Sequence, residues 1–108
     1  MELNKSKRIY EEGVKYIPGG VNSPVRAFQS VDSNPVFISK GYGSKIEDED
    51  GNTYIDYIGS WGPNILGHGN QKVLDGIDRV ISEGLSFGLP SKVEVYMAKL
   101  MVESYPAI

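Results

Sequence analysis

The sequence has 108 residues, of which 40% are hydrophobic, and its 11 basic and 14 acidic side chains give a formal net charge of −3. A chain of this length forms one ordinary domain at most, and it is too apolar for a disordered tail. The charges are mixed along the chain without a basic stripe, which argues against a nucleic-acid partner. Cysteine is absent and there is a single histidine, which excludes disulfides, thiolate catalysis and clustered His or Cys metal sites.

No apolar run in the sequence approaches the length of a membrane span. The first eight residues are polar and charged, and no apolar stretch follows them, so no secretory signal is indicated. We therefore expect a cytoplasmic protein with no membrane partner.

An N-terminal helix is predicted over residues 3–16, where apolar residues fall near one face. Gly13 lies inside this helix and weakens it by roughly 1 kcal/mol of propensity. Pro18 and the two glycines after it end the helix, and residues 18–34 are predicted to form an irregular loop. Loops of this length without regular structure are usually functional or disordered.

A three-stranded antiparallel meander is predicted next, because β-branched and aromatic residues recur there between glycines. The three strands are expected at residues 36–38, 44–48 and 53–58. Asp50-Gly51 is a strong hairpin signal, since both central positions of a type I′ turn need positive φ.

Two helices are predicted over residues 70–83 and 91–104. Asn70 is placed to cap the first helix, and Gly84 stands just beyond its end. Ser91 is followed three residues later by a glutamate, which is the spacing of a capping box.

The acidic run at residues 47–50 does not match a calcium loop. If Gly51 is aligned with the glycine that an EF-hand requires, Ile46 falls at the first ligand position and Tyr57 at the last. We interpret the run as a solvated hairpin tip. The glycine-rich stretches match neither dinucleotide nor Walker spacing and are interpreted as turns.

His68 lies in a glycine-rich loop before a predicted helix. A lone histidine could act as a general base, but no carboxylate is obviously placed to orient it. A structural role is therefore favoured. No catalytic, cofactor-binding or metal-ligating residue is assigned in the sequence.

Arg26 and Trp61 are the residues that could bind a small molecule. Arg26 follows Ser23 on a loop restrained by prolines, which suits bidentate recognition of a carboxylate. A surface arginine paired with a local acid explains the same residues equally well. Trp61 is flanked by Gly59 and Gly62, which leaves the indole open to a flat ligand, although composition alone favours a core-filling aromatic.

Four stretches carry a resemblance to a known family. Residues 43–57 and the sequence Leu-Gly-His at 66–68 are similar to the N-terminal meander of class III pyridoxal-phosphate aminotransferases. Pro-Gly-Gly-Val-Asn-Ser-Pro-Val-Arg-Ala-Phe at 18–28 and Ser-Trp-Gly-Pro at 60–63 resemble, more narrowly, the glutamate-1-semialdehyde aminomutases. The similarity extends over nearly the whole chain, including residues 86–90.

The resemblance implies the fold. It identifies an α+β segment, with an N-terminal helix, a three-stranded antiparallel meander and two helices, of a fold type I pyridoxal-phosphate transferase. Residues 1–108 would be the N-terminal part of the aminomutase, one incomplete domain that lacks most of the large cofactor-binding domain. The sequence stops at Ile108, two residues after a proline, which we interpret as the cut end of a longer chain.

The resemblance also implies a reaction and a set of partners. The intact enzyme would be an isomerase that uses pyridoxal 5′-phosphate to convert glutamate-1-semialdehyde to 5-aminolevulinate in tetrapyrrole (porphyrin) biosynthesis. Arg26 would pair with the substrate carboxylate, Ser23 would share its pocket, and Trp61 would line the substrate site. A homodimer is expected, with glutamyl-tRNA reductase as a candidate partner.

The segment alone is expected to be inactive. The family's Schiff-base lysine and its Ser-Gly-Thr phosphate loop lie beyond Ile108, so the resemblance assigns no cofactor contact here. Two other hypotheses stay open. The chain could belong to a class III ω-aminotransferase, or it could be a non-enzymatic domain that binds small carboxylates or another subunit.

Overall fold

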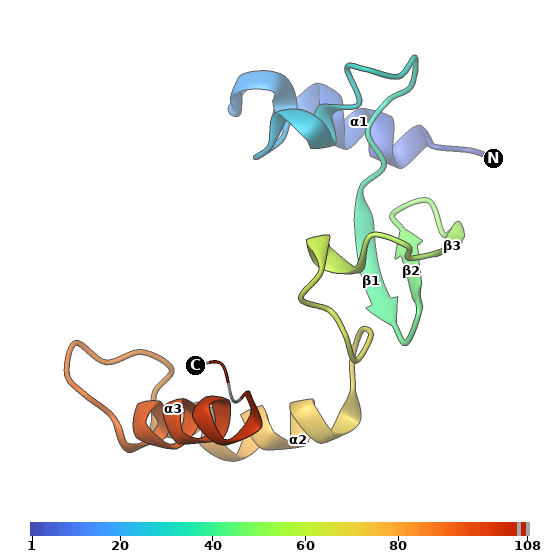
Figure 1. Ribbon diagram of the computed structural model, residues 1–108. Helices are drawn as coiled ribbons and strands as arrows, with labels where there is room; N and C mark the ends of the chain where they lie inside the picture. The colour runs from blue at the N-terminus through green and yellow to red at the C-terminus, as the bar shows by residue number, and fades with distance from the viewer. Residues whose placement is uncertain (106, 108) are drawn as a thin grey trace. The chain divides into compact units, whose positions relative to one another are not determined.

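The computed structural model describes residues 1–105 and 107 and divides into two compact units, Met1–Gln71 and Lys72–Ile108. The predicted α+β order of one helix, a three-stranded antiparallel sheet and two helices is confirmed (Figure 1). The helices are α1 (Asn4–Gly13), α2 (Gln71–Val80) and α3 (Lys92–Ser104). The strands are β1 (Ile38–Tyr42), β2 (Lys45–Asp48) and β3 (Thr53–Ile55), and they lie in the sheet in that order. Within the described residues, no helix is both long and apolar enough to cross a membrane.

Helix α1 ends at Gly13 rather than at residue 16, because the chain folds back onto the helix there. A Cβ added to Gly13 would lie 2.8 Å from the carbonyl oxygen of Gly20, so only glycine permits this approach. Gly20 in turn lies beneath the ring of Tyr10, and a Cβ on it would come within 2.5 Å of that ring. The predicted helix was therefore too long at its C-terminal end.

The first strand is present, but its predicted bounds of 36–38 are wrong, since β1 begins at Ile38 and runs through Gly41 to Tyr42. Gly41 is tolerated inside the strand because the His68 ring packs against it, where a Cβ would lie 2.5 Å from the ring. The turn to β2 is the two-residue loop at Gly43 and Ser44, with a φ of 53° at Gly43.

The turn between β2 and β3 is not the predicted type I′ turn. Gly51 has a φ of 88°, whereas Asp50 is not among the described residues with positive φ. Asp48 accepts a backbone bond from Gly51 and donates one to Asn52, at 3.1 and 3.0 Å. This is a three-residue loop that closes with a left-handed glycine.

The Asp48 carboxylate explains why this turn forms. One oxygen accepts the backbone amides of Asp50 and Asn52, at 3.0 and 2.7 Å, and the other accepts the Tyr54 hydroxyl at 2.7 Å and the Asn52 side-chain amide at 2.9 Å. Asp48 is only 1% exposed. The interpretation of this acidic run as a solvated tip was therefore wrong for Asp48.

The neighbouring carboxylate of Asp50 caps helix α1, although Asp50 lies 44 residues after Ser6 in the sequence. Its two oxygens accept the backbone amides of Lys5 and Ser6, at 2.7 and 2.9 Å. These amides are at the helix N-terminus, where no intrahelical acceptor exists and negative charge is favourable. The Ser6 hydroxyl then accepts the backbone amide of Phe37 at 3.2 Å, which ties the helix to the segment before β1.

Burial in the structure is sparse. Among the described residues, the buried ones are Ser6, Gly20, Ala27, Pro35 and Asp48. Two of these five are polar, so hydrogen bonds take over much of the role that an apolar core has in most domains.

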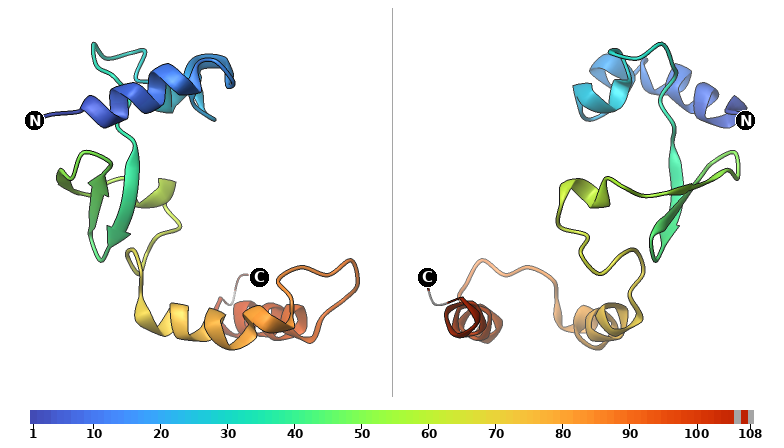
Figure 2. Two further views of the ribbon diagram at one scale, coloured as in Figure 1. Left: turned by 180° about the vertical axis from the view of Figure 1, so that it is seen from behind. Right: turned by 45° about the vertical axis from the view of Figure 1, so that its right-hand side comes forward.

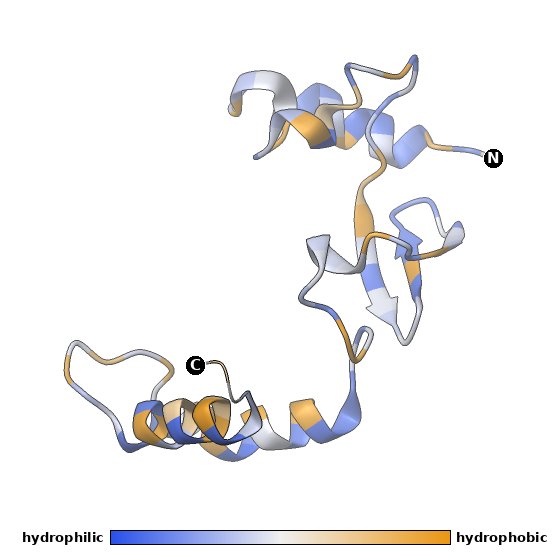
Figure 3. Ribbon diagram, in the orientation of Figure 1, coloured by the Kyte–Doolittle hydropathy of each residue, from blue (hydrophilic) through white to orange (hydrophobic). Residues whose placement is uncertain are grey.

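The second unit exposes its apolar side chains. Helices α2 and α3 are joined by a long connection (Figure 2) and carry apolar residues that Figure 3 colours orange. The exposed fraction of these side chains runs from 44% at Val73 to 73% at Val93. The helix pattern read from the sequence is thus confirmed, and within the described residues the apolar side chains of both helices are left about half-exposed.

The ends of these helices match the predictions in part. Gly84 follows a 3-10 turn at Ile81–Glu83 and has a φ of 103°, which favours glycine, but its ψ of 144° is not that of a left-handed helix cap. Helix α3 begins directly after Ser91, but the predicted capping box is wrong. The Ser91 hydroxyl donates to the Glu94 carboxylate at 3.2 Å instead of accepting a helix amide.

A matched pair of glycine substitutions tests the close approach at Gly13. Helix propensity alone predicts that alanine stabilises both Gly13 and Gly76 by about 1 kcal/mol. Nothing lies within 4 Å of a Cβ at Gly76, whereas a Cβ at Gly13 meets the Gly20 carbonyl. We expect Gly76→Ala to raise Tm slightly and Gly13→Ala to lower it, measured by circular dichroism. Equal stabilisation by both substitutions would contradict the packing described for α1.

The hydrogen bonds from the start of α1 to the Asp50 carboxylate should be lost in acid. Burial by itself raises the pKa of Asp48 and of Asp50, but the hydrogen bonds that each carboxylate accepts outweigh it and leave both pKa values lowered. Their stabilisation is therefore fully present above the unfolded value, about 3.9, and is lost as pH falls through the folded values.

Alkali should act on the same cluster through Tyr54. Burial, followed by the hydrogen bond to Asp48, raises the pKa of Tyr54 to about 12, so the stabilisation that Tyr54 contributes is lost as pH rises above about 10.

The acid prediction can be measured by NMR at the amides that Asp50 accepts. The amide chemical shifts of Lys5 and Ser6 should change below about pH 4 and stay constant from pH 5 to 8. Amide shifts that stay native at pH 2 would show that the carboxylates do not hold the helix.

Candidate functional site

Arg26 lies in a short 3-10 turn, Pro24–Ala27, whose first residue has its φ preset by the proline ring. The Arg26 amide donates to the Ser23 carbonyl at 2.9 Å, which closes the turn. The side chain is exposed, and within the described residues it has neither an ion pair nor a hydrogen bond. The alternative that Arg26 pairs with a local acid is therefore not what the structure shows.

The arginine borders an open hollow of about 410 Å³. The residues that line it are Ile17, Gly20, Val21, Asn22, Arg26, Pro35, Val36, Phe37 and Ile38. A mostly apolar wall with one free cation suits a short organic acid. Ser23 is half-buried but does not line this hollow, so only its backbone shares the turn with Arg26.

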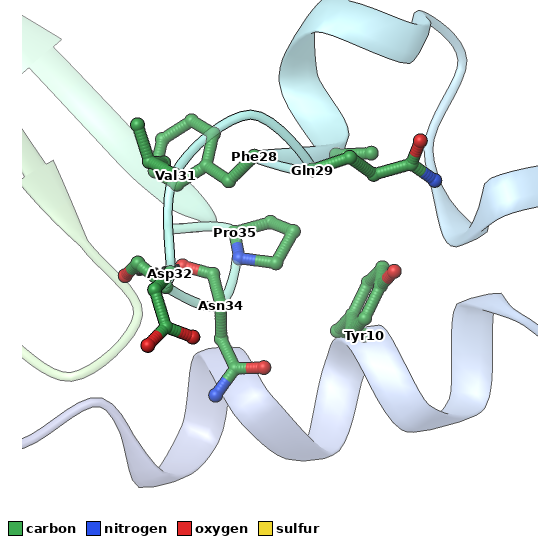
Figure 4. A pocket seen from close by; sticks show the side chains of 9 residues that line it. Tyr10, Phe28, Gln29, Val31, Asp32, Asn34 and Pro35 are labelled. Atoms are coloured by element: carbon green, nitrogen blue, oxygen red, sulfur yellow. Dashed lines mark hydrogen bonds between the residues drawn. The ribbon is translucent and has the colours of Figure 1, made fainter.

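The chain leaves the Arg26 turn through a left-handed residue, Phe28, which has a φ of 56°. Bulky side chains rarely adopt this conformation, which costs about 1–3 kcal/mol. A second hollow, of about 340 Å³, lies beside Phe28. Figure 4 shows Tyr10 of α1 on one side of it and Pro35 with the Phe28 loop on the other.

Trp61 stands at the end of a second strained turn, Gly59–Trp61. Ser60 and Trp61 are both left-handed, with φ values of 55° and 65°. Trp61 is 68% exposed, so the alternative that it fills a core is wrong for these residues.

This turn starts from Asp56. One oxygen of its carboxylate accepts the backbone amides of Ile58 and Gly59, at 2.9 and 3.0 Å, and the other lies 2.7 Å from Nε2 of His68. The hydrogen bond from His68, followed by the two amides, lowers the pKa of Asp56. Because an ionised carboxylate only accepts hydrogen bonds, Nε2 of His68 carries the proton in this pair.

His68 is fixed on the sheet by its own backbone. Its amide and carbonyl bond to the carbonyl and amide of Gly43, each at 2.8 Å. The structure is consistent with the structural role favoured for His68, because its backbone pairs with Gly43. The statement that no carboxylate is placed to orient the ring was wrong, because Asp56 does so. The spacing Asp56-x-x-Gly59, typical of a turn in which Asp accepts nearby amides, was the one local signal that could have drawn attention to Asp56.

The structure joins some of the predicted site residues and not others. Ser23 and Arg26 share one turn, whereas Trp61 lies in another, and the hollow beside Arg26 includes no residue of the Trp61 turn. Within the described residues, the three non-glycine residues of positive φ are Phe28, Ser60 and Trp61. All three fall in the stretches 18–28 and 60–63 that the sequence analysis singled out. The described residues contain no cluster of three or more potential metal ligands.

Comparison with known proteins defines the class. The family model of the class-III aminotransferases matches residues 28–104. The chain therefore belongs to the class-III aminotransferase family.

Particular relatives are closely similar over the chain's whole length. The glutamate-1-semialdehyde 2,1-aminomutase of Clostridium novyi (strain NT) is 60% identical over 108 residues, and the glutamate-1-semialdehyde 2,1-aminomutase 2 of Brevibacillus brevis is 57% identical. Both alignments cover 100% of this chain and 25% of the relative, so the chain spans about a quarter of the length of these relatives. A solved structure described as a transaminase with PLP bound superposes with a TM-score of 0.84 at 31% identity, over 95% of this chain and 24% of the other.

Proposed function

We propose that the chain is the N-terminal quarter of a glutamate-1-semialdehyde 2,1-aminomutase, an isomerase that converts glutamate-1-semialdehyde to 5-aminolevulinate for tetrapyrrole synthesis. One observation carries the proposal: the three strained non-glycine residues lie in the two stretches that resemble the aminomutases. Strained residues of this kind cluster at active sites and ligand-binding turns. Two relatives that are glutamate-1-semialdehyde 2,1-aminomutases, at 60% and 57% identity, support the assignment.

Arg26 is proposed to bind the substrate carboxylate. Its guanidinium has no ion pair or hydrogen bond within the described residues and borders an apolar hollow. It can therefore donate two parallel hydrogen bonds to a carboxylate without breaking an existing pair. Ser23 lies three residues earlier in the same turn and is proposed to lie in the same binding region. Trp61 is proposed to line the substrate site from the second strained turn.

The cofactor proposed for the intact enzyme is pyridoxal 5′-phosphate, which would supply the electron sink for moving the amino group. The described residues do not fit this group by themselves. Lys40 pairs with Glu47 at 3.0 Å, Lys99 lies 3.7 Å from Glu103, and Lys92 lies 5.2 Å above the ring of Tyr96. None of these lysines lines the hollow beside Arg26. The covalent anchor and the phosphate site are therefore assigned to the part of the relatives' length that this chain does not span.

A homodimer is proposed for the intact protein. It rests on the resemblance to the aminomutases and not on the exposed apolar side chains of α2 and α3, which the remainder of the same polypeptide would cover. Glutamyl-tRNA reductase as a partner and a cytoplasmic location stay predictions that rest on the sequence.

A class III ω-aminotransferase is the competing assignment, since the solved relative at 31% identity is described as a transaminase. The stretches 18–28 and 60–63 favour the aminomutase, because their sequences resemble the aminomutases and are not general to aminotransferases. The non-enzymatic hypothesis would need the same two turns to serve binding alone.

Replacing Arg26 in the full-length polypeptide tests the proposal. Arg26→Ala should weaken binding of glutamate-1-semialdehyde by about 2–5 kcal/mol, which raises KM roughly thirtyfold or more. Arg26→Lys should recover only part of the loss, because lysine cannot make the bidentate contact. Steady-state kinetics of 5-aminolevulinate formation would measure both.

Arg8→Ala is the matched control, since Arg8 is an exposed arginine of the same unit outside the hollow. It should leave KM within twofold of the parent. The carboxylate-binding role would be abandoned if Arg26→Ala behaved like this control. If the parent polypeptide transferred the amino group of an added amine donor to a keto acid and formed no 5-aminolevulinate, the ω-aminotransferase would replace the aminomutase.

A further inference from the structure

The Trp61 turn is strained, yet little packs around it. Two consecutive residues, Ser60 and Trp61, are left-handed, and a Cβ at Gly59 or Gly62 would meet nothing within 4 Å. Tyr57 before the turn is 90% exposed. Packing from outside therefore does not hold this conformation in the described residues.

Backbone hydrogen bonds hold the turn, and all of them lead back to two residues. Trp61 donates to the Ile58 carbonyl at 3.0 Å, and Gly62 and Asn64 donate to the Gly59 carbonyl at 3.0 and 3.1 Å. The amides of Ile58 and Gly59 are the pair that Asp56 accepts. The two residues whose carbonyls accept the bonds of the turn therefore both donate their own amides to the Asp56 carboxylate.

Asp56 is in turn held from two sides. Its backbone amide donates to the carbonyl of Ser44 in the β1–β2 turn at 2.9 Å, and its second carboxylate oxygen accepts a hydrogen bond from His68 Nε2. The Asp56 side chain is only 8% exposed, against 28% for His68. A carboxylate with both oxygens occupied and little solvent has few other orientations open to it.

His68 carries this constraint into the sheet. Its backbone bonds to Gly43 in both directions, and its ring lies against Gly41 so closely that no Cβ fits between them. Gly67 lies similarly close to Gly43, since a Cβ added to Gly67 would lie only 2.7 Å from the Gly43 carbonyl oxygen. The loop that bears Trp61 is therefore closed at both ends on the β1–β2 hairpin.

We propose that Asp56 and His68 form a clamp that holds the Ser60–Trp61 turn in its left-handed conformation and so sets the position of the Trp61 indole. They are positioning residues, because they act on a ligand through Trp61. The consequence for substrate binding rests on the proposed function, whereas the clamp itself is a property of this unit.

The test follows Trp61 in the full-length polypeptide labelled with 5-fluorotryptophan. Trp61→Phe identifies the Trp61 signal in the fluorine NMR spectrum. Asp56→Ala and His68→Phe should move or broaden that signal in the same way, because each opens the clamp. Asp56→Asn keeps one acceptor oxygen and should have a smaller effect, and His68→Gln, which keeps a side-chain N–H donor, should restore part of the parent spectrum.

The control is Glu47→Gln, which removes a carboxylate and the Lys40 ion pair in the same sheet without touching the loop. It should leave the Trp61 signal unchanged, and thermal unfolding should show that all compared variants are folded. If Asp56→Ala does not fold, Asp56→Asn and His68→Gln carry the comparison. A Trp61 signal that matches the parent in every folded clamp variant overturns the proposal.

Kinetics of the same variants separate the clamp from the proposed function. A displaced Trp61 signal with a kcat/KM at least tenfold lower supports both the clamp and the role of Trp61 at the substrate. A displaced signal with unchanged kcat/KM supports the clamp and removes Trp61 from the substrate site. The Arg26 experiment is unaffected by either result, so failure of the function and failure of the clamp are distinguishable.

Discussion

The N-terminal unit depends on carboxylates that accept backbone amides. Asp48 shapes the β2–β3 turn, and that turn presents Asp50 to the amides of Lys5 and Ser6 at the start of α1. Asp56 does the same for the Trp61 turn. An ionised acceptor is worth more than a neutral one, and an amide left without any acceptor is costly when buried. These bonds place α1, the sheet and the Trp61 turn in a unit where few apolar side chains are buried.

That reliance on polar contacts fits the extent of the chain. It spans about a quarter of the length of its curated relatives, and the apolar faces of α2 and α3 are about half-exposed. Under the proposed function, the remainder of the polypeptide would cover these faces and supply the cofactor site. The segment's own contribution would be a free arginine beside an apolar hollow and an exposed tryptophan on a strained turn.

The strain and the clamp belong together physically. A left-handed Trp61 persists only if neighbouring bonds over-determine it, and the contacts of Asp56 and His68 provide that excess of constraint. Phe28 is left-handed as well, where the chain turns away after Arg26 beside the hollow that Tyr10 and Pro35 line. The proposed substrate residue Trp61 is thus carried by backbone that has little freedom to relax.

Local pattern alone determined the order and type of the elements, the break at Gly84, the start of α3 after Ser91, and the motifs at 18–28 and 60–63 that indicate the family. Periodicity and turn chemistry act over a few residues, so a single sequence expresses them directly. Only the tertiary structure decided that α1 ends at Gly13 and that Asp56 orients His68. It also decided that Asp50 caps α1 by accepting the amide of Ser6, which lies 44 residues earlier in the sequence. Each of these pairs residues that the chain brings together by folding, and nothing in the local sequence encodes which distant amide a carboxylate will meet.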